Sequence, residues 1–444
     1  MKYKKHISSL FHNLRKNPMV MNIVAVAAVT LIVKGFGFYK EVVIASNFGL
    51  SELLDTFLIA SLVPGFIYQV FLSAFKSVFI PNYIMEQKTG RSIASFQATS
   101  FIVTISTTFF FMLLAYLFTN TFLELFFPNH TEAYYHLIKV QFFFLLPCIL
   151  FWGLSSLLSG LLNIHDEFKY STIYPVFTSI SILILLLFFK DVFQEKVLAI
   201  GMLIGSILEF TFLALVAKSK KIIQISKPDF KTDGTKLMFN QLPAKVSSGF
   251  LSGLIPITDQ YFAAQLVVGS IAALNYALKI PAFFTAIAVL ALSRVLLPHF
   301  SKLIANNKHE ASKQLNRMLK FVFISLVLVI IPIIVFSENI VSFIFERNEF
   351  TSQDSLLVSE LQIFLLIGAP FYICDNIIVQ FLTSLNKNAF MAYVSFGSML
   401  LNIILDYIFL KLYGIYGIVL CTTTLYIVRS LVLFSYANKQ KKYY

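Results

Sequence analysis

Long apolar runs, separated by short polar segments, recur along the whole chain. Most of these runs reach the ~20 residues that an α-helix needs to cross a bilayer. They are continuously apolar and do not alternate with a period of two, so they predict spanning helices and exclude a transmembrane β-barrel. We predict an all-α polytopic membrane protein with about twelve spans: 20–45, 56–80, 93–118, 134–162, 172–189, 197–217, 240–267, 272–298, 321–336, 356–385, 392–410 and 415–437.

The composition supports this class. Of the 444 residues, 58% are hydrophobic and 13% are charged, whereas a soluble domain has about 25% charged residues. No polar segment is long enough to fold a soluble catalytic domain. Disorder, a disulfide scaffold and a soluble enzyme with a membrane anchor are therefore excluded.

The polar connecting segments alternate in charge and predict the orientation. One alternating set carries 23 Lys/Arg and 6 Asp/Glu, and the other carries 4 Lys/Arg and 10 Asp/Glu. Basic segments mark the cytoplasmic side, so both termini are predicted to lie in the cytoplasm. The net charge of +13 then reflects topology and needs no nucleic-acid partner. The basic set is 1–19, 81–92, 163–171, 218–239, 299–320, 386–391 and 438–444.

Proline spacing reveals an internal repeat. Pro64 and Pro81 are 17 residues apart, and Pro281 and Pro298 repeat this spacing further along the chain. Each second proline closes a similar apolar segment at the end of a predicted helix. Chance coincidence is the alternative, but a second proline-to-asparagine spacing recurs at nearly the same offset. The sequence therefore predicts a duplication.

The duplication divides the chain into two lobes of six helices. The predicted parts are an N-terminal lobe, 1–217, a basic cytoplasmic linker, 218–239, and a C-terminal lobe, 240–444. An even number of helices gives both lobes the same orientation, so they form two parallel six-helix bundles. This organisation favours alternating access over a channel or a membrane-embedded enzyme.

Lysines inside the predicted spans are the strongest functional signal. Lys34 and Lys40 lie in the first helix with Glu41, and Lys279 lies just before Pro281. A lysine at a helix centre costs roughly 2.5–3.5 kcal/mol on insertion scales, so it should face the bundle interior or water. We predict that they line a charged central cavity. For the first helix the alternative is a Lys–Glu pair that locks two helices, and for Lys279 it is snorkelling to the membrane interface.

Other intramembrane charges have weaker assignments. Lys76 and Arg294 lie about one turn before the repeated prolines, where snorkelling or a cytoplasmic gate would explain them. Asp259 is equally consistent with a structural partner of a lysine and with a functional group. Asp55 lies at the outer end of the second predicted helix and favours the N-terminus of that helix electrostatically. For a further set we expect interhelical hydrogen bonds rather than ion sites: Glu209, Glu360, Asp375, Asp406 and Arg429.

The sequence has no recognisable catalytic or metal motif. It lacks a Gly-Lys-Ser/Thr phosphate loop and a His-Glu-x-x-His motif, and its three cysteines lie in apolar runs. We therefore predict no enzyme activity, no metal and no bound cofactor. Membrane potential or an ion gradient is then the expected source of energy.

Several loose motifs follow one another along the chain: Lys34-Gly35-Phe36-Gly37-Phe38-Tyr39-Lys40-Glu41, Phe48-Gly49, Asp55, Phe75 to Pro81, Gly269 to Ala277, Val295 to Pro298, Phe345 to Thr351 and Leu401-Asn402-Ile403. In this order they resemble the MurJ/MviN family of lipid II flippases in the MOP superfamily. The resemblance implies a two-lobe exporter that moves a polyprenyl-pyrophosphate-linked saccharide from the inner to the outer leaflet. It matches Lys34, Lys40 and Lys279 to the family's basic cavity residues.

Three features depart from the family pattern. Lysine stands where the family usually has arginine, and it lacks the bidentate guanidinium fork. The family's basic residue on the second helix falls near Ile67 and Tyr68, and neither is charged. Family members usually have fourteen helices, whereas this sequence predicts twelve.

These departures keep alternative functions open. A shorter twelve-helix flippase for an O-antigen or capsule unit belongs to the same superfamily, as does a MATE-type small-molecule exporter, although a drug cavity should be acidic. A non-transporting scaffold, glycosyltransferase or polymerase is a further alternative. We expect a bacterial inner-membrane location, membrane lipids and cell-envelope synthesis enzymes as partners, and residues 1–17 as a retained cytoplasmic segment.

Overall fold

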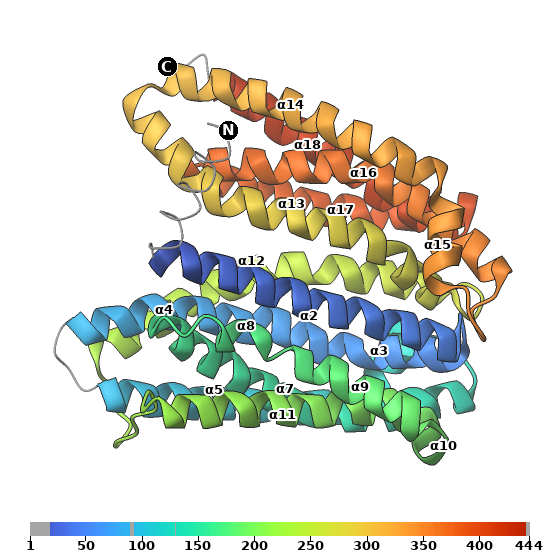
Figure 1. Cartoon of the computed structure of the whole chain (residues 1–444), viewed down its shortest axis with the longest axis horizontal. Helices are drawn as coiled ribbons and strands as arrows, with labels where there is room; N and C mark the ends of the chain where they lie inside the picture. The colour runs from blue at the N-terminus through green and yellow to red at the C-terminus, as the bar shows by residue number, and fades with distance from the viewer. Residues whose placement is uncertain (1–17, 89–92, 129, 441–444) are drawn as a thin grey trace, which may run out of the picture. The chain divides into compact units, whose positions relative to one another are not determined.

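The computed structural model describes residues 18–88, 93–128 and 130–440 (Figure 1). The predicted cytoplasmic segment 1–17 and the end of the basic tail, 441–444, lie outside the described residues. Within the described residues every regular element is a helix, and the single β-bridge, between Arg347 and Phe350, is isolated. The predicted all-α fold is confirmed.

The chain forms two compact units. The first contains Met1–Ile44 and Ile59–Gly249, and the second contains Ala45–Leu58 and Phe250–Tyr444. This division differs from the predicted lobes, because the short segment 45–58 joins the second unit and the boundary falls inside a helix. The predicted linker 218–239 begins in the last turns of one helix and ends in the first turns of the next.

The helices of the first unit match the first six predicted spans, and two carry irregularities that the sequence did not predict. The predicted helix 56–80 is continuous from residue 52 to 88 through a π-helical turn, η1, which lies between the positions of Pro64 and Pro81. The predicted helix 172–189 begins as a separate turn. The elements are α2 (Pro18–Phe48), α3 (Glu52–Ile67), η1 (Tyr68–Leu72), α4 (Ser73–Lys88), α5 (Ile93–Leu117), α6 (Thr119–Phe126), α7 (Glu132–Ile164), α8 (Tyr170–Ile173), α9 (Val176–Phe188), α10 (Lys190–Phe193), η2 (Gln194–Lys196) and α11 (Val197–Ser219).

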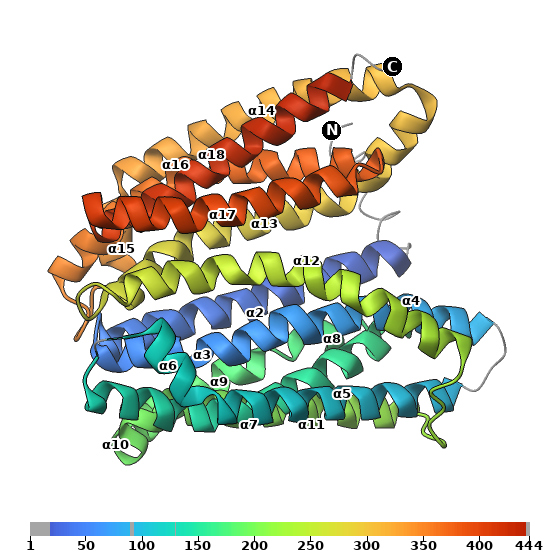
Figure 2. The same ribbon diagram turned by 180° about the vertical axis from the view of Figure 1, so that it is seen from behind.

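The second unit contains six long helices and one short one (Figure 2). The predicted polar connection 299–320 is mostly helical, which corrects the predicted start of the helix at 321. The break is confined to Asn307, whose side chain accepts the Glu310 N–H at 3.0 Å and so caps the following helix. The elements are α12 (Asp233–Ala263), α13 (Ser270–Asn306), α14 (Lys308–Val335), α15 (Ser337–Phe345), α16 (Ser352–Ser384), α17 (Asn388–Tyr413) and α18 (Ile415–Gln440).

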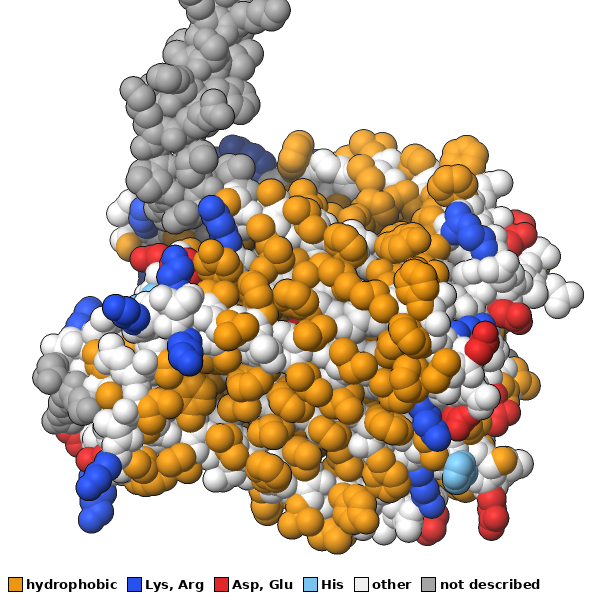
Figure 3. Space-filling model, turned by 60° about the horizontal axis from the view of Figure 1, so that its bottom comes forward, with side chains coloured by type: hydrophobic (Ala, Val, Ile, Leu, Met, Phe, Trp, Pro, Cys, Tyr) orange, Lys and Arg blue, Asp and Glu red, His pale blue; other side chains and the backbone are white. Residues whose placement is uncertain are grey.

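Among the described residues, nine helices are long and apolar enough to cross a membrane. The shorter apolar helix α9, together with α2 and α12, corresponds to the remaining predicted spans. On the face in Figure 3, hydrophobic side chains cover the middle and charged side chains gather at the two ends. This distribution suits a multi-pass membrane protein.

Small residues let helices of the first unit approach closely. A Cβ built on Gly205 of α11 would lie 2.4 Å from the Thr178 Cα of α9, and one on Gly201 would lie 3.0 Å from the Ile182 Cα. Helix association in lipid depends on such close packing, because burial of apolar surface supplies no driving force there. The pairing of α9 with α11 is therefore fixed by these two glycines.

Candidate functional site

The Asp55 carboxylate caps the first turn of α13. Asp55 is buried, with Oδ2 accepting the Gly269 N–H at 2.6 Å and Oδ1 accepting the Ala272 N–H at 2.7 Å. The first N–H groups of a helix have no partner within it, and a carboxylate there also meets the positive end of the helix dipole. Asp55 lies in the first turn of its own helix, α3, where we expected it to act, but its hydrogen bonds go to the N-terminus of a different helix, α13, within the second unit.

Two further contacts hold segment 45–58 in the second unit. Asn348 Nδ2 donates to Ser46 Oγ at 2.8 Å, and the Glu349 N–H donates to the Ser46 carbonyl at 3.2 Å. Gly269 has a φ of +92°, and a Cβ there would lie 2.6 Å from the Leu50 carbonyl oxygen. Glycine is therefore required where this segment meets the start of α13.

The charged motif of α2 contains a close ion pair. Lys40 Nζ lies 2.8 Å from Glu41 Oε1, and the two side chains are only 18% and 16% exposed. Lys34 is exposed on the same helix. Glu41 is thus paired with its neighbour Lys40 on α2.

Lys76 contacts another helix of the first unit. Its Nζ donates to Ser159 Oγ of α7 at 2.8 Å, and the lysine side chain is half-buried. In the second unit, Lys279 is half-buried on α13 next to the buried Ile280. Arg294 lies on the same helix, about one turn before Pro298, and its side chain lies outside the described part of the structure.

A buried polar cluster joins α12, α17 and α18. Asn402 Nδ2 lies 3.1 Å from Asp259 Oδ1, 3.0 Å from Asp406 Oδ2 and 3.5 Å from Cys421 Sγ. The Asp259 and Asp406 carboxyls also interact with each other. Asn402 and Asp406 are fully buried, and among the described residues no donor reaches Asn402 Oδ1. Oxygen atoms from three side chains therefore converge where a proton or a small cation would neutralise the two acids.

The sequence missed Asn402 as a member of this cluster. Asn402 and Asp406 are four residues apart, the spacing that places two side chains on one helical face. That spacing was available in the sequence, whereas the approach of Asp259 from α12 was not.

The other isolated charges have partners on neighbouring helices, as expected. Thr178 Oγ1 donates to Glu209 Oε1 at 2.6 Å, and Arg429 Nη1 lies 3.4 Å from Asp375 Oδ2. Tyr416 donates its hydroxyl hydrogen to Glu360. These groups link α9 to α11 and α16 to α18, which is a sufficient structural role.

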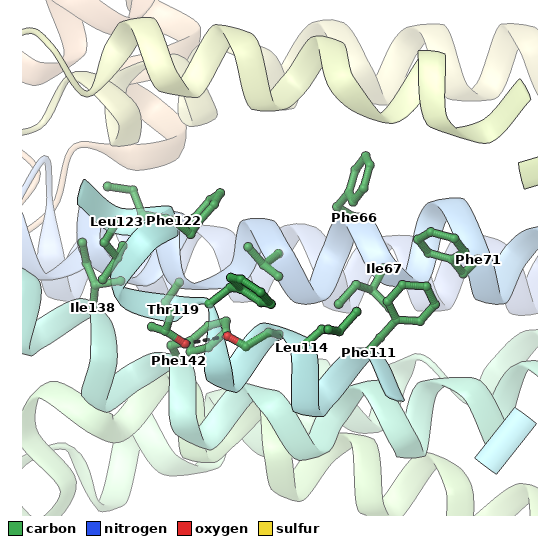
Figure 4. Close-up of a pocket in the computed structure, with 15 residues that line it drawn as sticks. Phe66, Ile67, Phe71, Phe111, Leu114, Thr119, Phe122, Leu123, Ile138 and Phe142 are labelled. Carbon is green, nitrogen blue, oxygen red and sulfur yellow. Dashed lines mark hydrogen bonds between the residues drawn. The ribbon is translucent and has the colours of Figure 1, made fainter. Parts of the chain in front are cut away.

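The first unit also encloses an apolar cavity of about 310 Å³ (Figure 4). Thr119, the one hydroxyl residue in its lining, begins α6 and donates to the Ala115 carbonyl in the last turn of α5, 2.6 Å away. The cavity can therefore hold hydrocarbon but offers no group for a charge. Its lining comprises Ile59, Ala60, Val63, Phe66, Ile67, Phe71, Phe111, Leu114, Ala115, Phe118, Thr119, Phe122, Leu123, Ile138 and Phe142.

The many apolar spans define a multi-pass membrane protein. Solved structures share its fold. A structure of the lipid II flippase MurJ in an inward closed conformation has a TM-score of 0.80 at 26% identity, covering 94% of this chain and 87% of that one. An inward-facing multidrug resistance MATE family transporter of the MOP superfamily has a TM-score of 0.78 at 12% identity, covering 94% of this chain and 98% of that one. The second likeness shows the fold alone.

The chain belongs to the MurJ family, because the family model described as lipid II flippase MurJ matches residues 44–444. The probable lipid II flippase MurJ of Rickettsia prowazekii is 25% identical over 430 residues, covering 94% of this chain and 84% of the relative. The lipid II flippase MurJ of Thermosipho africanus is 27% identical over 391 residues, covering 87% and 79%. The resemblance found in the sequence motifs is confirmed.

Proposed function

We propose that this chain moves lipid II, an undecaprenyl-pyrophosphate-linked saccharide, from the inner to the outer leaflet by alternating access. The observation that carries the proposal is the family match over residues 44–444, which contains Asp55, Asp259 and Lys279. The relatives named lipid II flippase MurJ and the shared fold support it. The protein acts as a transporter and not as an enzyme.

Three lysines would recognise the pyrophosphate. We assign this role to Lys34, Lys40 and Lys279, because each places an ammonium group in a predicted span. Charge-assisted hydrogen bonds to a phosphate strengthen where the dielectric is low. Lysine supplies the charge without the bidentate geometry of arginine, so we expect charge-selective binding with loose orientation.

Glu41, Lys76 and Arg294 would support this binding or the opening of the transporter. Asp55 would act through the first turn of α13, because its own carboxylate accepts two N–H groups there. Each of these assignments is a part of the proposal that a single substitution can test.

The buried cluster of Asp259, Asn402 and Asp406 would couple transport to an ion gradient. Its two acids need a proton or a small cation to remain buried. Occupancy and release of that ion would then favour different transporter states. No cofactor or structural metal is required.

We further propose that the protein lies in a bacterial cytoplasmic membrane with both termini in the cytoplasm, as the basic connecting segments favour. Enzymes of cell-envelope synthesis would supply its substrate. An O-antigen or capsule-unit flippase is the second candidate, favoured by uncharged residues at Ile67 and Tyr68. A MATE-type exporter is the third, favoured by the shared fold.

Depletion of the protein tests the function. We expect lipid II to accumulate in the cytoplasmic leaflet, and wild-type chain supplied in trans to reverse the accumulation. Accumulation of a different undecaprenyl-linked saccharide would favour the second candidate, and changed drug resistance alone would favour the third. No accumulation of any polyprenyl-linked sugar would contradict the proposal.

A further inference from the structure

A surface groove of about 530 Å³ lies at the end of α11, within the first unit. Its floor is apolar, since Phe210, Ala214 and Ile223 pack against the hydrophobic core. Its rim carries two lysines. The lining residues are Phe210, Thr211, Ala214, Leu215, Lys218, Lys221 and Ile223.

An apolar stripe on α11 leads to this rim. Ile204, Leu208 and Leu215 are 38%, 43% and 62% exposed. They lie with Thr211 and Lys218 at spacings of three and four residues, which place them on one helical face. The Thr211 hydroxyl donates to the Ile207 carbonyl of its own helix, 2.8 Å away. Because this hydroxyl is already hydrogen-bonded, it adds little polarity to the apolar stripe. A hydrocarbon chain lying along this stripe would end at the Lys218 ammonium.

The backbone presents the second lysine in an unfavourable conformation. The Ile222 N–H donates to the Ala217 carbonyl at 2.9 Å, and the Lys221 N–H donates to the Lys218 carbonyl at 3.0 Å. These two bonds close the helix with Lys221 at a φ of +55°. Glycine usually occupies this position, because a Cβ makes the left-handed conformation costly. Lysine therefore stands where stability alone would favour glycine.

Segment 222–229 is held against α5, so the groove is formed in advance. The fully buried Gln97 donates from Nε2 to the Ile222 carbonyl at 3.0 Å, and its Oε1 accepts the Gln224 N–H at 2.8 Å. Ser95 Oγ donates to the Lys227 carbonyl at 2.8 Å. Binding would therefore require little ordering of this segment.

The three neighbouring lysines have different surroundings. Lys220 Nζ lies 2.6 Å from Glu167 Oε1 and 5.8 Å from the Tyr170 ring centre, and the Glu167 carboxylate raises the pKa of Lys220. Among the residues that the structure describes, Lys218 and Lys221 have no carboxylate partner. The groove rim therefore carries two positive charges above an apolar floor.

We propose that this groove binds an anionic diacyl phospholipid, with the phosphodiester between Lys218 and Lys221 and an acyl chain along Leu208 and Leu215. The positive rim attracts the negatively charged phosphate, and the apolar stripe covers the acyl chain. A soluble phosphate would leave the stripe exposed, so the geometry favours a lipid. This inference concerns a bound membrane lipid and does not rest on the proposed transport of lipid II.

Native mass spectrometry of the full-length protein in detergent tests the proposal, with dioleoyl phosphatidylglycerol and dioleoyl phosphatidylcholine as probes. We expect phosphatidylglycerol to bind more tightly. Each of Lys218→Gln and Lys221→Gln should weaken it about fivefold, and the double variant about 30-fold. Lys220→Gln is the matched control, because it removes the same charge from the lysine paired with Glu167, and it should leave the affinity unchanged.

Three results would overturn the site. They are equal binding of the two phospholipids, wild-type phosphatidylglycerol affinity in the double variant, and an equal loss in Lys220→Gln. Undecaprenyl pyrophosphate forms a further arm. If the binding of undecaprenyl pyrophosphate depends on Lys218 and Lys221 while the binding of phosphatidylglycerol does not, the groove belongs to the transported lipid and the proposal fails.

Discussion

The carboxylate of Asp55 accepts the Gly269 N–H at 2.6 Å, although the two residues are 214 positions apart in the sequence. The same side chain accepts the Ala272 N–H, so one acid satisfies two N–H groups at the start of α13. Gly269 itself offers no side chain for capping. Asp55 is therefore the residue that joins segment 45–58 to this helix.

Replacement of Asp55 should destabilise the protein. Asp55→Ala leaves two buried N–H groups without an acceptor and should cost about 2–3 kcal/mol, since hydrogen bonds to charged groups are the stronger ones. Asp55→Asn keeps one acceptor and should cost less. Thermal unfolding in detergent measures the stability of both variants. Glu52→Gln is the control, because Glu52 lies with Asp55 in the first turn of α3. An unchanged unfolding temperature for Asp55→Ala would show that the cap contributes nothing.

Two roles of Lys40, binding of the pyrophosphate and neutralisation of Glu41, can be separated by substitutions. If Lys40 binds the pyrophosphate, Lys40→Ala should abolish transport, and the double variant Lys40→Ala/Glu41→Ala should remain inactive. If Lys40 only neutralises Glu41, the double variant should recover activity. Growth of a depletion strain supplies the readout, with membrane insertion measured for each variant. Lys411→Ala, which removes a lysine held by Tyr407, is the control.

The Asp259–Asn402–Asp406 cluster should control ion dependence. Asp406→Asn and Asp259→Asn each remove one of the two acids that would hold the ion, so the cluster should bind a proton or a small cation more weakly. We expect loss of gradient-driven transport with the protein still folded. Flipping rates under imposed sodium and proton gradients measure this, with Glu360→Gln as a control in the same unit. Wild-type gradient dependence in both variants would remove the cluster from the mechanism.

The substitution Lys221→Gly should change the stability of the protein and its lipid binding in opposite directions. Glycine adopts the left-handed conformation without the steric cost of a Cβ, so the variant should be more stable by about 1 kcal/mol. It should also bind phosphatidylglycerol about fivefold more weakly, because one rim charge is lost. Unfolding and native mass spectrometry on the same sample measure both effects. A parallel loss of stability and binding would contradict the role assigned to Lys221.

Much of the fold could be predicted because bilayer thickness imposes long apolar runs. All twelve predicted spans have a helical counterpart. Their ends were harder to predict, since polar helical extensions resemble loops: α14 begins at Lys308, thirteen residues before its apolar part. Only the Asn307 cap signals that start.

The site could be predicted less well. Intramembrane charges stand out in a sequence, so Lys40, Asp259 and Asp406 were found individually. Their partners depend on tertiary packing, as when Asp259 meets Asn402 across 143 residues. The contact of Asp55 with α13 and the lysine rim of the α11 groove likewise required coordinates.

Reconstitution tests the central claim most directly. The purified protein is placed in liposomes that contain lipid II, and the fraction of lipid II exposed to the outside is followed over time under an imposed ion gradient. Lipid II should cross at a rate that depends on the protein and that Lys279→Ala lowers to the rate of protein-free liposomes. A wild-type rate equal to that of protein-free liposomes, with transport of another undecaprenyl-linked saccharide or a drug, would contradict the account.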